Sequence, residues 1–380
     1  MTDGTSSMMR HRSRSVSRLA VFLPGLFGGG AERAMLNLAT GIARHGYHVD
    51  LVLASATGPY LGDVPSSVRL IDLSARRTAA SLPALVRYMR KERPAAMVSA
   101  LSRANIVSLI GRRITGLPFP LIVNEQNTLS QWIRRAGDWR TRLTPHVVKR
   151  CYPWANALVG VSDGVVQDLR GLGVRARRLE TIYNPVITPE FERRAAAPLD
   201  HPWFDSGQPP VLVAVGSLTP QKDFSTLLRA FAQLRTERPA RLIILGEGAE
   251  RRDLETLSRA LRLDDDVDLP GFVRNPIPFV KRAAAFVLSS RWEGLPTVVI
   301  EALYCGVPIV STNCPSGPRE ILRGGRYGLL VPVGDPERLS RALKAALAGS
   351  APQVPLEAWR PYELDAIVSS YLRLLFPDQR

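Results

Sequence analysis

The sequence predicts an α/β protein built from two successive domains, each with a mostly parallel β-sheet. Its 380 residues exceed the length at which a single hydrophobic core keeps growing, so two domains are expected. Short apolar runs bounded by glycine or proline alternate with segments of helical length, which is typical of β-α-β units. This series starts twice, near residues 18 and 210. Residues 193–210 have the Pro, Ala and Gly content of an interdomain linker.

The first series contains a glycine-rich loop between its first strand and its first helix. The predicted elements in chain order are a strand at 18–24, a loop and helix at 28–46, and strands at 48–54, 95–101, 120–126 and 156–162. We therefore assign residues 17–195 to a first domain. Residues 1–16, which are rich in arginine, are expected to form a flexible basic N-terminal segment.

The second series repeats the same alternation. We assign residues 196–361 to this second domain, and residues 362–380 contain a final amphipathic helix that could pack on either domain. The predicted strands are 210–218, 240–248, 266–273, 283–290 and 307–312, with helices at 223–238, 249–263 and 296–306.

The composition is that of a globular protein in a reducing compartment. Three cysteines, Cys151, Cys305 and Cys314, show neither a paired pattern nor metal-ligand spacing, so no disulfide is expected. The five histidines form no ligand cluster, so no metal is expected either. No window approaches the roughly 18 apolar residues of a membrane span, and Pro24 breaks the apolar run that follows the N-terminal arginines. We therefore expect a cytoplasmic protein without a signal peptide.

The net charge of +16 is concentrated in the first domain. Through residue 195 there are 28 Lys and Arg against 13 Asp and Glu, a net charge of +15, whereas the remaining residues hold 22 against 21, a net charge of +1. A basic first domain suggests an anionic partner, such as a membrane surface, a phosphorylated substrate or nucleic acid. Because no nucleic-acid-binding motif is recognisable, we do not expect nucleic acid.

Two carboxylates, Glu293 and Glu301, stand eight residues apart around a Gly-Leu-Pro turn. The preceding strand is expected to end near Ser290, so Glu293 lies at the carboxyl end of a parallel strand, where open α/β sheets bind ligands. Glu301 follows on a helix, on the face shared with Thr297. Unpaired N–H groups at the helix start can bind a phosphate, and carboxylates accept hydrogen bonds from neighbouring hydroxyls. These groups fit a sugar nucleotide, although two surface glutamates of an ordinary α/β unit are an equally good interpretation.

Residues 289–322, which contain both glutamates, resemble the E-x7-E motif of the retaining family 4 glycosyltransferases of the GT-B type. Other segments resemble that family's motifs in the same order, and these are 28–53, 215–231, 242–255 and 269–276. The resemblance covers roughly residues 17–345. It implies two Rossmann-like domains facing each other across a cleft, with the donor in the second domain and the acceptor in the first. It also implies that the last helix packs back on the first domain.

The resemblance implies roles for single residues. Glu293 would contact the hexose hydroxyls, Glu301 would hold the ribose hydroxyls, and Lys222 would pair with the donor diphosphate. Gly246 and Gly248 would let the backbone approach the nucleotide. Core packing is the alternative for the apolar members of the set, and a solvated helix-start lysine is the alternative for Lys222. The other donor-binding residues implied are Gly30, Ser217, Phe272, Val273, Gly294, Leu295 and Thr297.

Two positions depart from the family's pattern. Ser217 stands where an arginine is common, so Lys222 is expected to carry more of the diphosphate charge. Gln126 stands where relatives often have histidine near the reacting sugar. Because glutamine cannot act as a general base, Gln126 is at most a positioning residue in the catalytic set. Its neighbour Glu125 could supply a base, although a carboxylate that caps the strand end is about as good an interpretation.

The resemblance implies transfer of a hexose or N-acetylhexosamine from a nucleoside-diphosphate sugar, with a UDP-sugar favoured, to a glycan or lipid-linked sugar with the anomeric configuration retained. Lys222 and the helix-start amides would offset the charge that grows on the leaving diphosphate. No cofactor or metal is expected. Asp264, Asp265 and Asp266, which could be mistaken for a metal motif, are predicted to form a solvated turn.

Residues 130–154 interleave aromatic and basic side chains. Such a mixture suits a surface helix on anionic lipid, which would place the protein peripherally at the inner face of a membrane. The alternative is a solvated helix face with some buried tryptophans. The aromatic residues are Trp132, Trp139, Tyr152 and Trp154, and the basic residues are Arg134, Arg135, Arg140, Arg142, Lys149 and Arg150.

Other functions stay open from the sequence. A sugar-nucleotide epimerase or a phosphorylase would share the GT-B architecture. A non-catalytic relative that binds polyanions would account for the basic domain and for the departures at Ser217 and Gln126.

Overall fold

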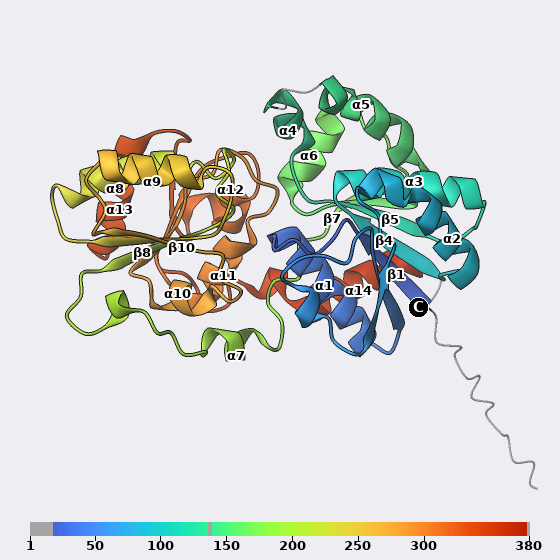
Figure 1. Ribbon diagram of the computed structural model, residues 1–380, viewed down its shortest axis with the longest axis horizontal. Helices are drawn as coiled ribbons and strands as arrows, with labels where there is room; N and C mark the ends of the chain where they lie inside the picture. The colour runs from blue at the N-terminus through green and yellow to red at the C-terminus, as the bar shows by residue number, and fades with distance from the viewer. Residues whose placement is uncertain (1–17, 136–138, 378–380) are drawn as a thin grey trace, which may run out of the picture.

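The computed structural model describes residues 18–135 and 139–377, so the predicted N-terminal segment lies outside the described residues. The chain forms two lobes that lie side by side, each with a β-sheet between helices (Figure 1). Every pair of neighbouring strands within the two sheets is parallel. The predicted α/β class with two Rossmann-like sheets is therefore confirmed.

The first sheet has seven strands in the order β3-β2-β1-β4-β5-β6-β7. Its central strands are apolar along almost their whole length because helices cover both faces of a parallel sheet. All residues of β4 and β5 are buried. The strands are β1 (Arg18–Leu23), β2 (His48–Leu53), β3 (Val68–Asp72), β4 (Ala96–Ala100), β5 (Leu121–Glu125), β6 (Ala157–Gly160) and β7 (Leu179–Thr181).

Helix α1 follows the glycine loop, with Glu32 in its first turn and Arg44 in its last, which suits the helix dipole. The side chain of Ser162 caps α6 by accepting the backbone N–H of Val165. The helices of the first domain are α1 (Gly30–Arg44), α2 (Leu82–Glu92), α3 (Ser102–Thr115), α4 (Leu129–Arg135), α5 (Trp139–Cys151) and α6 (Asp163–Gly171).

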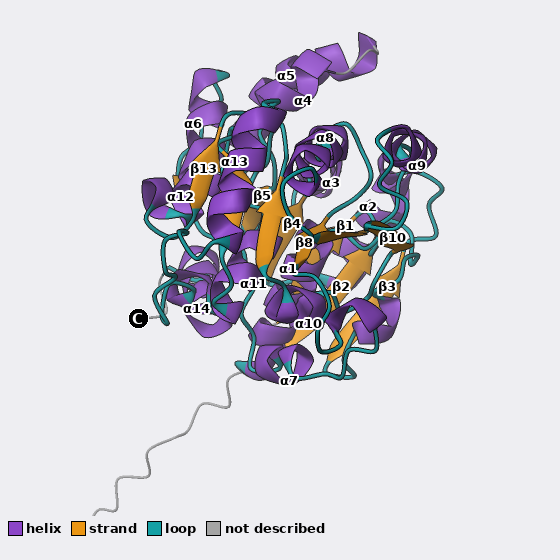
Figure 2. Cartoon of the chain, turned by 90° about the vertical axis from the view of Figure 1, so that its left-hand side faces the viewer, coloured by secondary structure: helices purple, strands orange, loops and turns teal. Residues whose placement is uncertain are grey.

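The second sheet has six strands in the order β10-β9-β8-β11-β12-β13. Viewed from this end of the molecule, α8, α9 and α13 lie on one side of the sheet and α10 and α11 on the other (Figure 2). As predicted, Asp264–Asp266 form a turn before β10. The strands are β8 (Val211–Val215), β9 (Arg241–Leu245), β10 (Val267–Gly271), β11 (Ala285–Leu288), β12 (Ile309–Thr312) and β13 (Leu329–Val331). The helices are α8 (Phe224–Arg235), α9 (Arg251–Ala260), α10 (Ile277–Arg282), α11 (Thr297–Cys305), α12 (Pro318–Ile321) and α13 (Pro336–Leu347).

The chain passes between the domains twice, and the two crossings touch. After β7, the backbone N–H groups of Val186 and Ile187 donate to the carbonyl of Tyr362, and Leu364 N–H donates to the carbonyl of Ile187. The short helix α7 (Phe191–Ala195) follows the first crossing in the chain, and α14 (Leu364–Leu375) follows the second crossing. The Phe191 ring packs against Tyr304 of α11 with ring centroids 4.5 Å apart.

Helix α14 packs against α1 of the first domain (Figure 1). The two helices approach so closely that a Cβ on Gly41 would lie 2.6 Å from a methyl carbon of Val368. The hydroxyl of the buried Tyr371 accepts a hydrogen bond from the side-chain amide of Asn124 at the end of β5. Residues from the far end of the chain therefore complete the core of the first domain.

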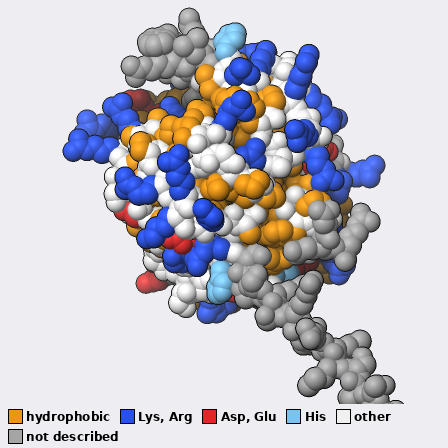
Figure 3. Space-filling view, turned by 90° about the vertical axis from the view of Figure 1, so that its right-hand side faces the viewer, with side chains coloured by type: hydrophobic (Ala, Val, Ile, Leu, Met, Phe, Trp, Pro, Cys, Tyr) orange, Lys and Arg blue, Asp and Glu red, His pale blue; other side chains and the backbone are white. Residues whose placement is uncertain are grey.

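The end of the first domain far from the second domain is strongly basic. Figure 3 shows Lys and Arg side chains spread over this face, with few acidic side chains between them. Within residues 18–135 and 139–377, no helix is both long and apolar enough to cross a membrane.

Candidate active site

A cavity of about 630 Å³ lies between the two domains. Its walls come from loops at the carboxyl ends of parallel strands, which is where open α/β sheets bind ligands. Of the residues predicted for the site, all but Gly248 line this cavity. They are Gly30, Gln126, Ser217, Lys222, Gly246, Phe272, Val273, Glu293, Gly294, Leu295, Thr297 and Glu301.

Gly248 does not line this cavity, and its expected role toward the nucleotide stays a prediction. A Cβ at this position would lie 2.3 Å from the carbonyl oxygen of Leu218, so loop packing requires the glycine. Gly246 is required for a similar reason, because its Cβ would lie 1.9 Å from the carbonyl oxygen of Gly216 and its φ is +151°. Unlike Gly248, however, Gly246 also faces the cavity.

Glu293 is held in a fixed orientation inside the second domain. Its Oε1 lies 2.6 Å from Lys222 Nζ and accepts the hydroxyl of Ser290 at 2.6 Å. Gln221 Nε2 approaches Oε2 at 3.4 Å. The carboxylate is only 7% exposed, so these partners replace the water that would otherwise solvate it.

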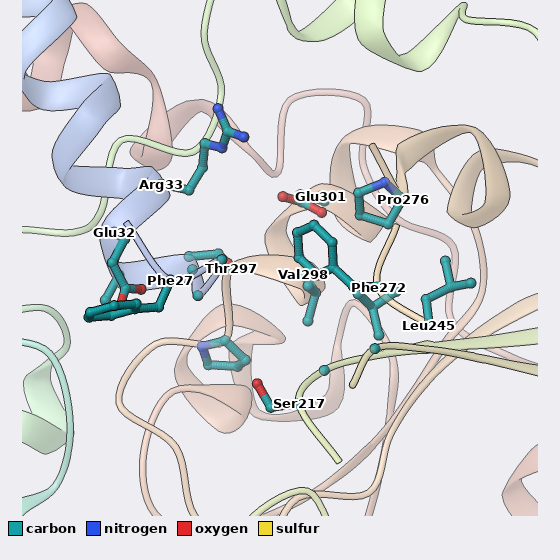
Figure 4. Close-up of a pocket in the computed structure, with 18 of the residues that line it drawn as sticks. Phe27, Glu32, Arg33, Ser217, Leu245, Phe272, Pro276, Thr297, Val298 and Glu301 are labelled. Carbon is teal, nitrogen blue, oxygen red and sulfur yellow. The ribbon is translucent and has the colours of Figure 1, made fainter. Parts of the chain in front are cut away.

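Helix α11 directs its N-terminus into the cavity. The N-cap residue is Pro296, which has no N–H and offers no side-chain cap. The backbone N–H groups of Thr297 and Val298 are therefore available to an anion. Gly30 of the first domain faces this helix start, since a Cβ on Gly30 would lie 2.6 Å from the hydroxyl of Thr297. The glycine loop thus lies directly beside this helix start, and Phe27, which precedes the loop, lies near Thr297 (Figure 4).

Glu301 differs from Glu293 because its carboxylate has no hydrogen-bond or ion-pair partner among the described residues. It is 9% exposed, and its Oε2 is buried without a hydrogen bond from any described residue. Burial raises the pKa of Glu301 to about 7, and the charges of Arg194 and Arg33 oppose this rise. Its carboxylate points toward the side of the cavity where Arg33 lies (Figure 4).

Gln126 belongs to an amide network and does not present a free group to the cavity. Its Nε2 donates to Asn124 Oδ1 at 2.6 Å and to Asn184 Oδ1 at 3.1 Å. Asn184 Nδ2 donates back to Gln126 Oε1 at 2.8 Å. Since Asn124 also donates to Tyr371, helix α14 supports this wall of the cavity. These contacts fit a positioning residue.

Glu125 points away from the cavity. Its carboxylate accepts the Tyr152 hydroxyl at 2.6 Å and the Ser102 hydroxyl at 3.0 Å. Complete burial raises the pKa of Glu125 to about 7. Glu125 does not line the cavity, so it is not placed to act as a base there. Its contacts fit a carboxylate that caps the end of the strand.

The rim of the cavity is bridged by side chains from both domains. Asp63 of the first domain pairs with Arg33 and, across the cleft, with Arg274 of the second domain. The ring centroids of Tyr60 and Phe272 lie 6.2 Å apart. Phe272 is 42% exposed, which excludes core packing as its role.

Further contacts hold the domains together beside Glu293. The Thr128 hydroxyl donates to the carbonyl of Glu293 at 3.2 Å, and the Ser162 hydroxyl donates to the carbonyl of Gly294 at 2.8 Å. A Cβ on Gly294 would lie 2.0 Å from the carbonyl oxygen of Gln126. A glycine is thus required where the first domain touches the second.

Residues 28–190 match the family model described as Glycosyltransferase Family 4, and residues 201–357 match the model described as Glycosyl transferases group 1. The two matches lie in order on either side of the linker and take in most of the chain. The chain belongs to glycosyltransferase family 4.

Curated relatives support this assignment. A Campylobacter jejuni N-acetylgalactosamine-N,N'-diacetylbacillosaminyl-diphospho-undecaprenol 4-alpha-N-acetylgalactosaminyltransferase is 26% identical over 343 residues, which cover 87% of this chain and 90% of the relative. The lipopolysaccharide core biosynthesis glycosyltransferase LpsE of Rhizobium meliloti is 28% identical over 358 residues, covering 91% of this chain and 96% of the relative.

Solved structures confirm the GT-B fold of this family 4 glycosyltransferase. The sucrose-phosphate synthase of Thermosynechococcus elongatus superposes with a TM-score of 0.78 at 21% identity, covering 95% of this chain and 99% of that chain. Anabaena HepE, solved in complex with UDP-glucose, superposes with a TM-score of 0.75 at 17% identity, covering 95% of this chain and 99% of that chain.

The sequence did not single out several residues that line the cavity of this glycosyltransferase. Arg33 follows the glycine loop by three residues, but nothing in the sequence shows that its side chain lines the cavity and pairs with Asp63. Arg194 lies in the linker region, where no motif marks it. Asn184 follows β7 and could have been found only from its contact with Gln126.

The aromatic and basic stretch at 130–154 forms α4 and α5, and residues 136–138 between them lie outside the described residues. Tyr152 is fully buried in the core, and Trp154 lies under the guanidinium of Arg113 at 4.8 Å. These two aromatic residues therefore serve the packing of the domain. The side chains of Trp132 and Trp139 lie outside the described part of the structure.

Within residues 18–135 and 139–377, no group of three or more His, Cys, Asp or Glu side chains could hold a metal ion. The chemistry that the cavity can perform with its own residues is the binding of phosphate, of hydroxyls and of a leaving anion.

The ion pair between Lys222 and Glu293 yields a prediction about stability. Lys222→Met would leave the buried Glu293 carboxylate without a cation. The free energy of unfolding should therefore fall by roughly 3 kcal/mol. This is the lower end of the range for a broken buried ion pair, because the Lys222 side chain is 18% exposed. Glu293→Gln combined with Lys222→Met should recover part of this loss. Denaturant unfolding measures both, with the exposed Lys281→Met as the matched control. Equal unfolding midpoints for the two lysine variants would contradict the prediction.

Proposed function

We propose that this family 4 enzyme transfers a hexose or N-acetylhexosamine from a UDP-sugar to a glycan or lipid-linked sugar acceptor, with retention of the anomeric configuration. One observation carries the proposal. A single interdomain cavity combines the Lys222–Glu293 pair, the open N-terminus of α11 and the unpartnered Glu301 carboxylate. Glu293 suits the hexose, Lys222 and the helix start suit the diphosphate, and Glu301 suits the ribose.

The proposed donor site lies in the second domain. Phe272 and Val273 flank the end of the cavity near Glu301, which leaves room for a base beside a ribose. The name of the C. jejuni relative specifies transfer of N-acetylgalactosamine, and HepE was solved with UDP-glucose. The HepE complex supports a UDP-sugar as the donor, and the two names together cover a hexose and an N-acetylhexosamine.

The proposed mechanism uses the protein mainly to position and polarise. The bond between the anomeric carbon and the diphosphate oxygen breaks, and its electron pair stays on the diphosphate. Lys222 and the free amides of Thr297 and Val298 offset that charge. The acceptor hydroxyl then bonds to the anomeric carbon on the same face, and its proton passes to an oxygen of the departing diphosphate. Gln126 positions this wall and takes no proton.

The proposed acceptor enters from the first domain, over Gly28, Gly29 and Gly30. These three glycines carry no side chains, so an acceptor hydroxyl can pass them to approach the donor phosphate. The first domain's basic face (Figure 3) suits attachment to an anionic membrane surface, where lipid-linked acceptors are found. The C. jejuni relative is named for an undecaprenol-linked acceptor and LpsE for lipopolysaccharide core synthesis, which supports this class of acceptor.

The function is tested first with donors and then with variants. A thermal-shift panel of UDP-, GDP- and ADP-sugars should raise the melting temperature only with the true donor class. With the selected donor and a lipid-linked acceptor, Lys222→Ala and Glu293→Gln should each lower kcat by about 10²- to 10³-fold, because each removes a group that acts on the reacting sugar or the leaving diphosphate.

The matched control for these kinetics is Lys281→Ala on the exposed side of α10, which should keep wild-type activity. Parental activity in both site variants would refute the assigned roles. Isomerisation of the donor sugar without transfer would instead indicate an epimerase, and phosphate-dependent cleavage of a glycan would indicate a phosphorylase.

The pKa of Glu301 predicts a pH dependence of donor binding. Ribose hydroxyls donate to the charged carboxylate, so protonation below about pH 7 should weaken binding of a UDP-sugar, approaching tenfold per pH unit well below the pKa. Glu301→Gln should bind more weakly and lose this dependence. Calorimetry between about pH 6 and pH 8.5 measures both. The cavity contains no described histidine that could titrate in the same range, and identical pH profiles for the two proteins would contradict the prediction.

Membrane attachment gives a separate prediction. The protein should sediment with vesicles that contain anionic phosphatidylglycerol but not with pure phosphatidylcholine vesicles, and about 0.5 M salt should release it. Lys149→Glu with Arg150→Glu, both exposed on α5, should weaken binding. The control, Arg338→Glu with Arg341→Glu on α13 of the second domain, should not. An equal loss of vesicle binding in the α5 and α13 double variants would contradict a specific role of α5 and would show that only net charge matters.

A further inference from the structure

Most of the charged side chains that line the cavity are already paired within the protein. Lys222 lies 2.6 Å from Glu293, and Arg33 lies 2.5 Å from Asp63, which also pairs with Arg274. Three of the four described cations of the lining therefore have carboxylate partners.

Two further carboxylates of the lining are also occupied. Glu247 pairs with Arg251 at 2.6 Å. Glu32 stands three residues after Gly29, the N-cap of α1, and accepts the backbone N–H of Gly29, so it caps its own helix. A Cβ on Gly29 would lie 2.3 Å from Glu32 Oε2, which shows how closely this cap fits.

Arg194 and Glu301 are the two charges of the lining that remain without a partner among the described residues. Arg194 lies on α7 and is partly buried. Its backbone is held in place, because its carbonyl accepts Asn275 Nδ2 at 2.8 Å. Its guanidinium makes no ion pair with any described carboxylate. Arg194 is nevertheless the stronger of the two cations that lower the pKa of Glu301.

Arg194 and Glu301 thus line the same cavity with opposite charges that no described side chain pairs with. A purely anionic ligand group would satisfy Arg194 and be repelled by Glu301, and a cationic group would do the reverse. A pair of adjacent hydroxyls satisfies both, because each hydroxyl can donate one hydrogen bond and accept others. A neutral diol is therefore the ligand group that can bind both Arg194 and Glu301.

We propose that Arg194 donates a hydrogen bond to a ribose hydroxyl of the donor while Glu301 accepts from the ribose diol, so that the two residues select ribonucleotide over deoxyribonucleotide donors. This inference rests on the proposed function, because it assigns the diol to a nucleotide sugar. A deoxyribose would leave a buried group unpaired, and sites built to bind a hydroxyl reject analogues that lack it.

The test measures affinities of UDP, 2'-deoxy-UDP and 3'-deoxy-UDP by calorimetry for wild type and for Arg194→Met, which keeps most of the apolar stem. If the donor panel selects guanine, the guanosine series replaces these probes. The wild type should bind at least one deoxy analogue about tenfold or more weakly than UDP. Arg194→Met should lose about tenfold in affinity for UDP and much less for that analogue.

The matched control is Arg193→Met, because Arg193 is the exposed neighbour on the same helix turn and should leave all three affinities unchanged. Melting temperatures verify that each variant folds, and Arg194→Lys, which keeps the charge without the planar fork, should show an intermediate loss. An equal loss for UDP and both analogues in Arg194→Met, or no loss at all, would overturn the proposal.

The outcome also separates this inference from the proposed function. If the wild type binds none of the nucleotides, the proposed donor class fails. If it binds UDP and the loss in Arg194→Met does not depend on the ribose hydroxyls, only the role of Arg194 fails.

Discussion

The cavity depends on a close approach between the two domains at Gly294. The carbonyl oxygen of Gln126 lies where a side chain at position 294 would begin, and the hydroxyls of Thr128 and Ser162 bind the carbonyls on either side of that point. Because Glu293 precedes Gly294 and α11 begins three residues later, this contact sets where the carboxylate and the helix start lie relative to the first domain. This one junction therefore fixes the position of the E-x7-E motif relative to the first domain.

The two glutamates of the motif illustrate different uses of a buried carboxylate. Glu293 meets Lys222 and Ser290 inside its own domain, so its charge is compensated before any ligand arrives. Glu301 is buried beside cations that it does not contact, so the free protein bears the cost of an unsatisfied polar group. Functional sites commonly hold such costs, and a ligand that supplies hydroxyls relieves this one.

The sequence was most informative where function and local structure coincide. The strand, turn and helix around Glu293 are marked by glycine and proline, so their order and the position of both glutamates could be predicted. Gly248 could not be assigned, because a glycine required by a neighbouring carbonyl and one required by a ligand have the same sequence pattern. The position of Arg194 in the cavity wall depends on how the linker packs against the segment before α10. The burial of Tyr152 depends on its hydrogen bond to Glu125. Both are contacts between residues far apart in the sequence.

The return of α14 to the first domain has a consequence for how such proteins can be recombined. Tyr371 belongs to the last helix, yet it supports Asn124 and, through it, the amide network of Gln126. A chimera that exchanged everything after the linker would replace this helix along with the second domain and would disrupt the packing of the first domain. Exchange points at both crossings, near Ile187 and Glu363, would keep each domain intact, so the second domain is connected as an insertion within the first domain.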